Sequence, residues 1–433
     1  MKPNLLFIFT DQQRADTMAC YGNGHIDTPN LNTLGDKSFV FENAYVSQPV
    51  CSPSRATMLC GLYPHTARVP ACNVPLPKDV KTIAEMVSPT YRRCYNGKWH
   101  LGDQPQHLPT AHGFDEYYGI PYSNDMQSAR RGDPPLPLVD EKTVIEAPAD
   151  QATLTQRYTK RAVEFIEKNK ARPFFLYLPH TFPHLPLFAS KDFHGKSANG
   201  RYGDSVEEID WSTGQIIDCL DRLKLSNDTV VIFTSDNGSN GRNGGSNVPL
   251  SGAKGSTMEG GMRVPMIARW PGRIAAGSTC KELSTTMDFL PTFAAISGAK
   301  LSGAKIDGFD ISPLLLGKEN ATSPYEAFYY YRRRQLQAIR WGDWKWHLPL
   351  EKTHPNWTTP KATGRGRPGR LYNLAKDLRE RNNVLKDNPD VMKKMRKLAK
   401  QAVSSIGNDA ADGSEARHAL TLDSSAPLVL KKK

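Results

Sequence analysis

The sequence predicts an α/β fold: a large mixed, mostly parallel β-sheet sandwiched by helices, followed by a smaller α+β domain with an antiparallel sheet. Three short apolar runs are typical of buried parallel strands, namely Leu5–Phe9, Phe174–Leu178 and Val230–Phe233. Helical periodicity near 152–169 and 204–224 precedes the second and third runs. Alternation of strands and helices at this spacing indicates a parallel sheet with helices on both faces.

The composition of the chain changes from about residue 320. The elements predicted there are two strands rich in Tyr and Trp at 326–331 and 336–347, a loop at 351–370 and a helix near 388–404. A turn at Gly342-Asp343 divides the second Tyr/Trp segment, which indicates antiparallel pairing. We therefore predict one domain over 1–320 and a smaller one over 321–433, with a poorly ordered tail from about 406.

Charge and composition limit the classes of function. The chain has 433 residues, 39% of them hydrophobic, and no apolar run approaches the roughly 20 residues of a membrane span. Lys and Arg exceed Asp and Glu by 56 to 44, which favours an anionic partner such as a lipid, a small acid or a polysaccharide. We expect no nucleic-acid binding, because no nucleic-acid-binding motif is present. The seven cysteines are scattered without a C-x-x-C pair, which excludes a disulfide framework or a zinc site.

Polar side chains follow each of the three predicted strands. Asp11 and Gln12 come after the first strand, His180 and His184 after the second, and Asp236-Asn237 after the third. Ligands of parallel sheets collect beyond the carboxyl ends of the strands. We therefore expect these acids, amides and histidines to share one edge of the sheet.

The segment Cys51-Ser52-Pro53-Ser54-Arg55 has two interpretations. Pro53 and Ser54 suit the start of a helix, which places Cys51 at the positive end of the helix dipole. Such a position binds anions and lowers the pKa of a thiol, so Cys51 could be an ordinary cysteine nucleophile. The alternative is a structural cysteine beside a capped helix.

The segment from Cys51 to Gly61 also resembles the signature of type I sulfatases, in which a maturation enzyme oxidises the cysteine to Cα-formylglycine. Other blocks resembling this family follow in its order: Gly97–Gly102, His112–Asp115, Pro183–Pro186, Ser235–Gly238, Lys254-Gly255, Glu259–Pro265 and Leu371–Leu374. Together they cover nearly the whole chain. The resemblance implies an alkaline-phosphatase-like fold, a catalytic sulfatase domain over 1–320 and hydrolysis of a sulfate ester to an alcohol and inorganic sulfate.

The residues after the first and third strands are candidate metal ligands. Asp11, Gln12, Asp236 and Asn237 offer only oxygen ligands, which suit a hard cation such as Ca²⁺ and not zinc. The resemblance adds the modified Cys51 to this set. Family members commonly carry a second acid at the position of Gln12, so the site has less negative charge here. We expect Ca²⁺, with Mg²⁺ as the weaker candidate.

The resemblance also implies a mechanism. Hydrated formylglycine at Cys51 would attack sulfur with one hydroxyl. Arg55, Lys98 and Lys254 would neutralise the sulfuryl and attacking oxygens. Lys98 and Lys254 could instead be surface lysines, although the glycines beside them favour close approach of a ligand.

Two histidines are candidates for proton transfer. His184 would protonate the departing oxygen, and His100 would take a proton from the covalent intermediate so that sulfate leaves and the aldehyde regenerates. Either could instead be a core histidine that holds a loop. Weaker candidates for contact with the substrate are His180, Arg14, Tyr95 and His107.

The class of substrate is predicted from charge. The basic excess, including Arg332-Arg333-Arg334 and Arg365, Arg367 and Arg370, favours a sulfated polysaccharide over a small aryl or alkyl sulfate. Two other functions stay open. One is a phosphonate monoester or phosphodiester hydrolase, and the other is a catalytically silent sulfated-glycan-binding protein with unmodified Cys51. Localisation is also open: periplasmic or secreted if a leader was trimmed, otherwise cytoplasmic.

Overall fold

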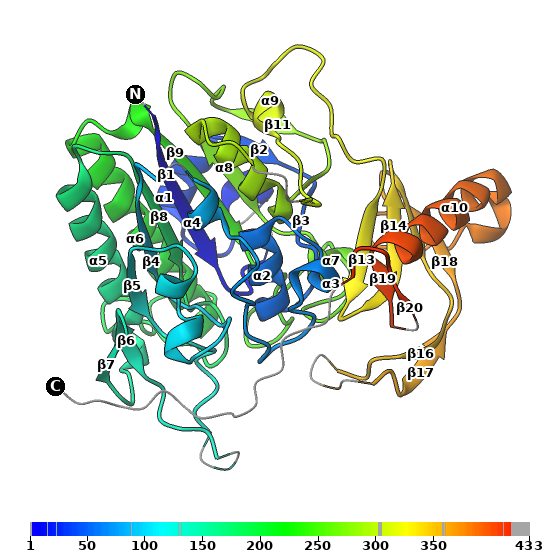
Figure 1. Cartoon of the computed structure of the whole chain (residues 1–433), viewed down its shortest axis with the longest axis horizontal. Helices are drawn as coiled ribbons and strands as arrows, with labels where there is room; N and C mark the ends of the chain where they lie inside the picture. The colour runs from blue at the N-terminus through cyan, green and yellow to red at the C-terminus, as the bar shows by residue number, and fades with distance from the viewer. Residues whose placement is uncertain are drawn as a thin grey trace.

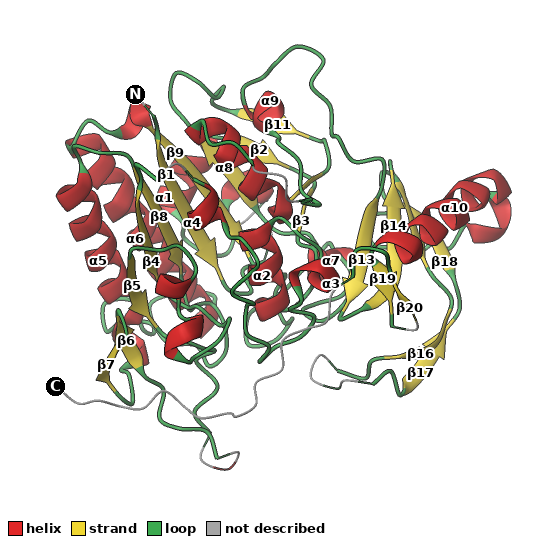
Figure 2. Cartoon of the chain, in the orientation of Figure 1, coloured by secondary structure: helices red, strands yellow, loops and turns green. Residues whose placement is uncertain are grey.

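The computed structural model describes residues 2–416, except 15, 23, 88, 129, 131, 302–304, 357–358, 360 and 410. Its largest element is a mixed sheet of ten strands (Figures 1 and 2). Their order across the sheet is β11 (Ser278–Cys280), β2 (Phe39–Phe41), β10 (Met266–Arg269), β9 (Thr229–Ser235), β1 (Asn4–Thr10), β8 (Phe174–Pro179), β4 (Arg92–Asn96), β5 (Glu116–Gly119), β6 (Leu138–Asp140) and β7 (Thr143–Glu146). The five strands from β9 to β5 pair in parallel, whereas β10, β6 and β7 pair antiparallel with their neighbours. This confirms the predicted mixed, mostly parallel sheet.

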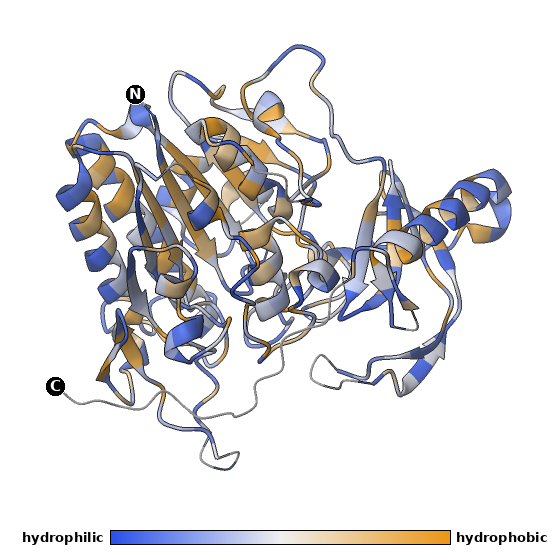
Figure 3. Ribbon diagram, in the orientation of Figure 1, coloured by the Kyte–Doolittle hydropathy of each residue, from blue (hydrophilic) through white to orange (hydrophobic). Residues whose placement is uncertain are grey.

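Alternate side chains of β1 enter two different cores. Leu5, Phe7 and Phe9 face a core shared with α2 (Cys51–Cys60), α4 (Ile83–Met86) and α8 (Phe289–Ser297). Leu6 and Ile8 face the opposite core, which is shared with α1 (Pro29–Asp36), α5 (Leu154–Asn169) and α6 (Gly200–Arg222). Figure 3 shows the central strands as a mostly apolar layer between these helices. The predicted helices near 152–169 and 204–224 correspond to α5 and α6.

The C-terminal part contains a four-stranded antiparallel sheet, which confirms the predicted antiparallel sheet. Its order is β13 (Phe328–Arg332), β14 (Gln335–Trp341), β15 (Trp344–His347) and β18 (Arg370–Asn373), and α10 (Pro389–Ser405) contacts β14. One core contains apolar residues of this sheet and of the first part, including Tyr330, Leu336, Tyr45 and Met262. The two parts of the chain therefore pack directly against each other. The domain boundary at 320/321 stays a prediction.

Shorter elements complete the chain. They are α3 (Pro64–Ala67), α7 (Glu259–Met262), α9 (Ser312–Leu315), and the strand pairs β3 (Ala44–Tyr45) with β12 (Ser284–Thr285), β16 (Leu350–Thr353) with β17 (Gly364–Arg367), and β19 (Gly407–Asn408) with β20 (Ala411–Asp412). The segment 351–370 is thus partly a strand pair and not only a loop. The predicted disordered tail falls partly on β19 and β20 and partly on residues 417–433, which lie outside the described residues. Within the described part of the chain, each helix is too short or too polar to cross a bilayer.

Candidate active site

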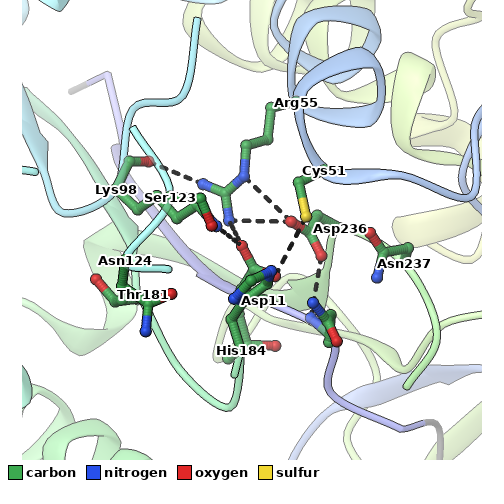
Figure 4. A network of polar contacts seen from close by, with 12 residues as sticks. Asp11, Cys51, Arg55, Lys98, Ser123, Asn124, Thr181, His184, Asp236 and Asn237 are labelled. Carbon is green, nitrogen blue, oxygen red and sulfur yellow. Dashed lines mark hydrogen bonds and ion pairs between the residues drawn. The ribbon is translucent and has the colours of Figure 1, made fainter. Parts of the chain in front are cut away.

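Two neighbouring strands bring the four predicted oxygen ligands to one edge of the sheet, and Figure 4 labels three of them, Asp11, Asp236 and Asn237. β1 and β9 are parallel, and Thr10 pairs with Ser235, so the residues that follow each strand lie at the same level. The backbone amide of Gln12 donates to Asp236 Oδ1 at 3.1 Å. All four side chains are buried: Asp11, Gln12, Asp236 and Asn237.

Arg55 lies between the two carboxylates of this group. Its Nη2 is 2.9 Å from Asp11 Oδ2 and 3.0 Å from Asp236 Oδ2, and all three side chains are fully buried. Burial opposes ionisation of Asp11, but the charges of Lys98 and Arg55 outweigh it and hold its pKa well below the usual value. Burial and the charge of Asp11 raise the pKa of Asp236 to about 6. Asp11 is therefore the more strongly ionised carboxylate.

Lys98 also contacts Asp11. Its Nζ donates to Asp11 Oδ2 at 2.6 Å and to Ser123 Oγ at 3.0 Å. Lys98 follows β4, and the preceding Gly97 has φ of 144° in close contact with β8. A Cβ on Gly97 would lie 2.0 Å from the Pro179 carbonyl oxygen, so this strand end requires glycine.

Cys51 is the first residue of α2, as predicted, and lies in a short chain of contacts. Its Sγ is 3.1 Å from Lys254 Nζ and 3.5 Å from Asp11 Oδ1. The same Nζ is 3.1 Å from His184 Nε2, while His184 Nδ1 is 2.5 Å from the Leu185 carbonyl oxygen. Because a carbonyl can only accept, Nδ1 carries the proton and Nε2 accepts from Lys254.

The environment of Cys51 does not favour an ordinary thiolate nucleophile. Burial, followed by the charge of Asp11, raises the pKa of its thiol far above the usual value. The dipole at the start of α2 suggested a lowered pKa, but the adjacent carboxylate and the loss of water outweigh it. Lys254 stays protonated, because the charges of Asp11 and Asp236 offset the effect of burial and raise its pKa.

The structure brings His100 and His184 to the site but not His180. Burial and the charge of Lys98 lower the pKa of both His100 and His184 well below the usual value, so both imidazoles are neutral at pH 7. The ring nitrogens of His100 are buried without a hydrogen-bond partner among the described residues, and its φ is 61°. His180 is also buried, but it does not line the cavity that contains Cys51.

That cavity has a volume of about 1030 Å³. Its lining includes Gln12, Cys51, Cys72, Asn73, His100, Ser123, Asp125, His184, Arg242 and Lys254. Three of the weaker candidates for contact with the substrate do not line it, namely Arg14, Tyr95 and His107. The hydroxyl of Tyr95 instead donates to the Lys98 carbonyl at 2.7 Å.

Sequence reasoning missed several residues of the cavity. Ser123, Cys72 and Asn73 lie in loops, where no regular spacing marks the residues that face a site. The end of β5 at Gly119 was the available signal for Ser123, because that loop follows another parallel strand toward the same edge of the sheet.

The oxygen-bearing side chains fit a hard cation. Asn237 Nδ2 donates to the Gly238 carbonyl at 2.9 Å, while its Oδ1 is buried and accepts no hydrogen bond from the residues that the structure describes. A free acceptor beside two carboxylates suits Ca²⁺ or Mg²⁺. One ligand atom from each of Asp11, Cys51 and His184 also lies within 4.8 Å of the others, but the sulfur and nitrogen of the last two are not ligands that a hard cation prefers.

This fold and site define a metal-dependent hydrolase of the alkaline-phosphatase-like superfamily. Residues 3–299 match the family model of sulfatases, residues 323–423 match the C-terminal region of aryl-sulfatase, and residues 254–351 match the C-terminal model of N-sulphoglucosamine sulphohydrolase. The chain belongs to the sulfatase family and is a sulfuric ester hydrolase. A metal ion and a formylglycine made from the active-site cysteine are typical of this family.

Individual relatives support this assignment. The chain is 37% identical to N-acetylgalactosamine-6-sulfatase of Canis lupus familiaris over 376 residues, covering 80% of this chain and 72% of the relative. It is 34% identical to arylsulfatase A of Homo sapiens, covering 92% and 87%. The solved structure of Ps i-CgsB in complex with k-i-k-neocarrahexaose superimposes with a TM-score of 0.78 at 30% identity and covers 93% of both chains.

Proposed function

We propose that this enzyme removes sulfate from a sulfated carbohydrate, with Cys51 converted to formylglycine by a maturation enzyme. The observation that carries the proposal is the position of Lys254 Nζ, 3.1 Å from both Cys51 Sγ and His184 Nε2. These contacts join the residue to be modified, a cation and a proton-transfer group. They lie beside a cavity of about 1030 Å³, which can hold more than one sugar ring.

The charge of the site favours a sulfate monoester. Three cationic side chains, Arg55, Lys98 and Lys254, contact or adjoin Cys51 and the carboxylate of Asp11. They would neutralise the sulfuryl oxygens as charge moves onto them. We propose that Ca²⁺ is held by Asp11, Gln12, Asp236, Asn237 and the modified Cys51, and when bound it supplies further positive charge for this purpose.

Proton transfer would involve the neutral histidines. Lys254 donates to His184 Nε2, so the two form a proton-bearing pair that can protonate the departing alcohol oxygen. His100 lines the same cavity and has buried ring nitrogens with no partner among the described residues. Because it is neutral, it can accept the proton of the remaining formylglycine hydroxyl.

The carbohydrate substrate is inferred from relatives and charge. One relative is named for N-acetylgalactosamine 6-sulfate, and one structural neighbour holds a neocarrahexaose. The net charge of +12 would attract a sulfated saccharide more strongly than a small ester with one charge.

The first experiment is peptide mass spectrometry across Cys51, on protein made with a formylglycine-generating enzyme. We expect a peptide lighter by about the mass of one water. The converted protein should hydrolyse 4-nitrophenyl sulfate faster than the matched phosphonate ester. Cys51→Ala should lower kcat by about a thousandfold or more, whereas Cys72→Ala, which removes another thiol of the cavity, should keep most of the activity.

The same preparation tests the metal and the substrate. After a chelator removes the metal, Ca²⁺ should restore more activity than Mg²⁺, and sulfate release from sulfated oligosaccharides should exceed that from aryl sulfate in kcat/KM. Faster hydrolysis of the phosphonate would favour the phosphonate hydrolase. Binding of saccharides without turnover by fully converted protein would instead favour the silent receptor.

A further inference from the structure

A second cavity, of about 270 Å³, adjoins the active site where the two parts of the chain meet. One wall is the segment 253–257 of the first part, and the other comes from β13, β14, β17 and the residues after β16. Lys254 lines both this cavity and the active-site cavity. A chain-like substrate with its sulfate at Cys51 could therefore extend into it.

Two arginines give this cavity its charge. Arg332 ends β13 and Arg367 ends β17, and the Nε atom of each is buried without a hydrogen-bond partner in the described residues. Arg367 is held in place because its Nη2 donates to the Gln337 carbonyl at 3.0 Å. Both arginines thus keep hydrogen-bond donors unused beside the cavity.

No acidic side chain neutralises these arginines from within the cavity. Among the described residues, the lining contains Lys254, Arg332 and Arg367 as its charged groups and no carboxylate. Burial, and then the charge of Arg332, lowers the pKa of Arg367, while the charge of Glu380 opposes this effect. Burial and Arg333 likewise lower the pKa of Arg332. The cavity is therefore lined by three cationic side chains and no carboxylate, and an oxyanion bound there would stabilise this positive charge.

We propose that Arg332 and Arg367 bind a second anionic group of the same saccharide, a sulfate ester or a uronate carboxylate, while its reacting sulfate lies at Cys51. This proposal rests on the proposed function. It defines the substrate class as a glycan with at least two anionic groups, because the planar guanidinium groups match the oxygens of either anion. It also gives the C-terminal sheet a direct part in substrate selection.

The test uses full-length converted protein, 4-nitrophenyl sulfate as the reporter and oligosaccharides as competitors. Desulfated chondroitin oligosaccharides carry carboxylates alone, κ-carrageenan oligosaccharides carry sulfates alone, and dextran is neutral. The measured quantity is the inhibition constant divided by the KM of the reporter in the same variant. We expect this ratio to rise about tenfold in Arg332→Gln for whichever anionic oligosaccharide binds, and to rise further when Arg367→Gln is added.

Two control variants separate binding from damage to the fold. Arg332→Lys keeps the charge but loses the planar guanidinium, so its ratio should lie between those of wild type and Arg332→Gln. Arg365→Gln removes an exposed arginine of β17 that does not line the cavity, and should leave the ratio within about twofold of wild type. The competitor whose ratio responds identifies the anion as sulfate or carboxylate.

Three results would overturn the proposal: an unchanged ratio in Arg332→Gln, an equal change in Arg365→Gln, or no anionic competitor that inhibits more strongly than dextran. Failure of the proposed function is distinguishable, since converted wild type would then not hydrolyse the reporter. In that case, binding calorimetry with the same oligosaccharides measures their dissociation constants for wild type and the variants without turnover.

Discussion

At Arg55, one guanidinium faces two buried carboxylates, and its removal would leave Asp11 with Lys98 alone and Asp236 without its ion-pair partner. The side chains of Arg55, Asp11 and Asp236 are all fully buried. Breaking such a group by removal of one partner costs about 3–5 kcal/mol of stability. We predict this loss for Arg55→Ala by urea denaturation, together with a fall in kcat of at least about a hundredfold.

A surface arginine provides the matched control for Arg55. Arg222 pairs with Glu167, and the two side chains are 57% and 45% exposed. Arg222→Ala should leave the free energy of unfolding nearly unchanged, because solvent screens such pairs. Equal losses in the two variants would contradict the role given to Arg55.

His112 offers a test of pH dependence at a single buried residue. It is fully buried against Trp99, at 5.7 Å between ring centroids, and both ring nitrogens lack a partner among the described residues. Burial lowers its pKa to about 4, so the unfolded chain binds its proton more readily between pH 6.5 and 4. Above pH 6.5 the lowered pKa of His112 does not change the free energy of unfolding. As the pH drops from 6.5 to 4, that free energy falls, because the unfolded chain takes up the proton more readily.

We therefore predict that His112→Phe gains about 1–2 kcal/mol more stability at pH 5 than at pH 8, measured by urea denaturation at both values. His194→Phe is the control, because that imidazole is exposed and its solvation changes little on folding. A His112→Phe effect that is the same at both pH values would show that protonation is not involved.

The positions of individual site residues were predictable where a strand end determined them. Asp11 and Asp236 follow apolar runs, and the parallel register of β1 and β9 brings them together. Tyr95 was predicted less well, because a tyrosine at the end of β4 can pack inward or face a ligand. Here its ring packs on Trp99, at 5.0 Å between centroids.

At the scale of the element, strands buried on both faces were predictable and short or exposed ones were not. β1, β8 and β9 consist mainly of apolar residues because helices cover both faces of the sheet. β4, with sequence RRCYN, carries two arginines in ion pairs with Glu116 and Asp115, so no apolar run marks it. β16 and β17 are polar and carry glycines and arginines, which sequence reasoning assigns to loops.

The contact between α7 and β15 depends on a buried charge cluster. Lys345 Nζ lies 2.8 Å from Glu259 Oε1 and 3.0 Å from Glu380 Oε1, and these side chains are fully buried. Burial opposes ionisation of Glu259, but Lys345 and Arg340 hold its pKa at about 2. Both carboxylates therefore depend on Lys345 at neutral pH.

We predict that Lys345→Met lowers the free energy of unfolding at pH 7 by about 3–5 kcal/mol. The loss should shrink toward pH 3, where the carboxylates of the variant take up protons and no longer need a partner. Lys352→Met, at an exposed position of β16, should cost less than about 0.5 kcal/mol. A loss below about 1 kcal/mol for Lys345→Met would mean that the cluster contributes little to the contact between the two parts.

At the scale of the whole molecule, the sequence predicted the two parts but not how they meet. Periodicity and composition describe each sheet separately, whereas the shared core around Tyr45, Met262 and Tyr330 depends on contacts between distant segments. The arginine-lined cavity also forms where the two parts meet. From the sequence alone, the clustered arginines therefore indicate only a general preference for anions.

The net charge of +12 leads to a prediction about ionic strength. The field of the whole molecule attracts a polyanion over a distance of about one Debye length, which is about 10 Å at 0.1 M salt. Between about 20 and 200 mM NaCl, we expect the KM for a multiply sulfated oligosaccharide to rise about fivefold or more, with kcat nearly constant, because screening weakens encounter but leaves the buried chemistry unchanged. The KM for 4-nitrophenyl sulfate, which carries a single charge, should rise less. Initial rates across this salt range measure both values, and a KM for the oligosaccharide that does not respond to salt would remove charge as the basis of substrate preference.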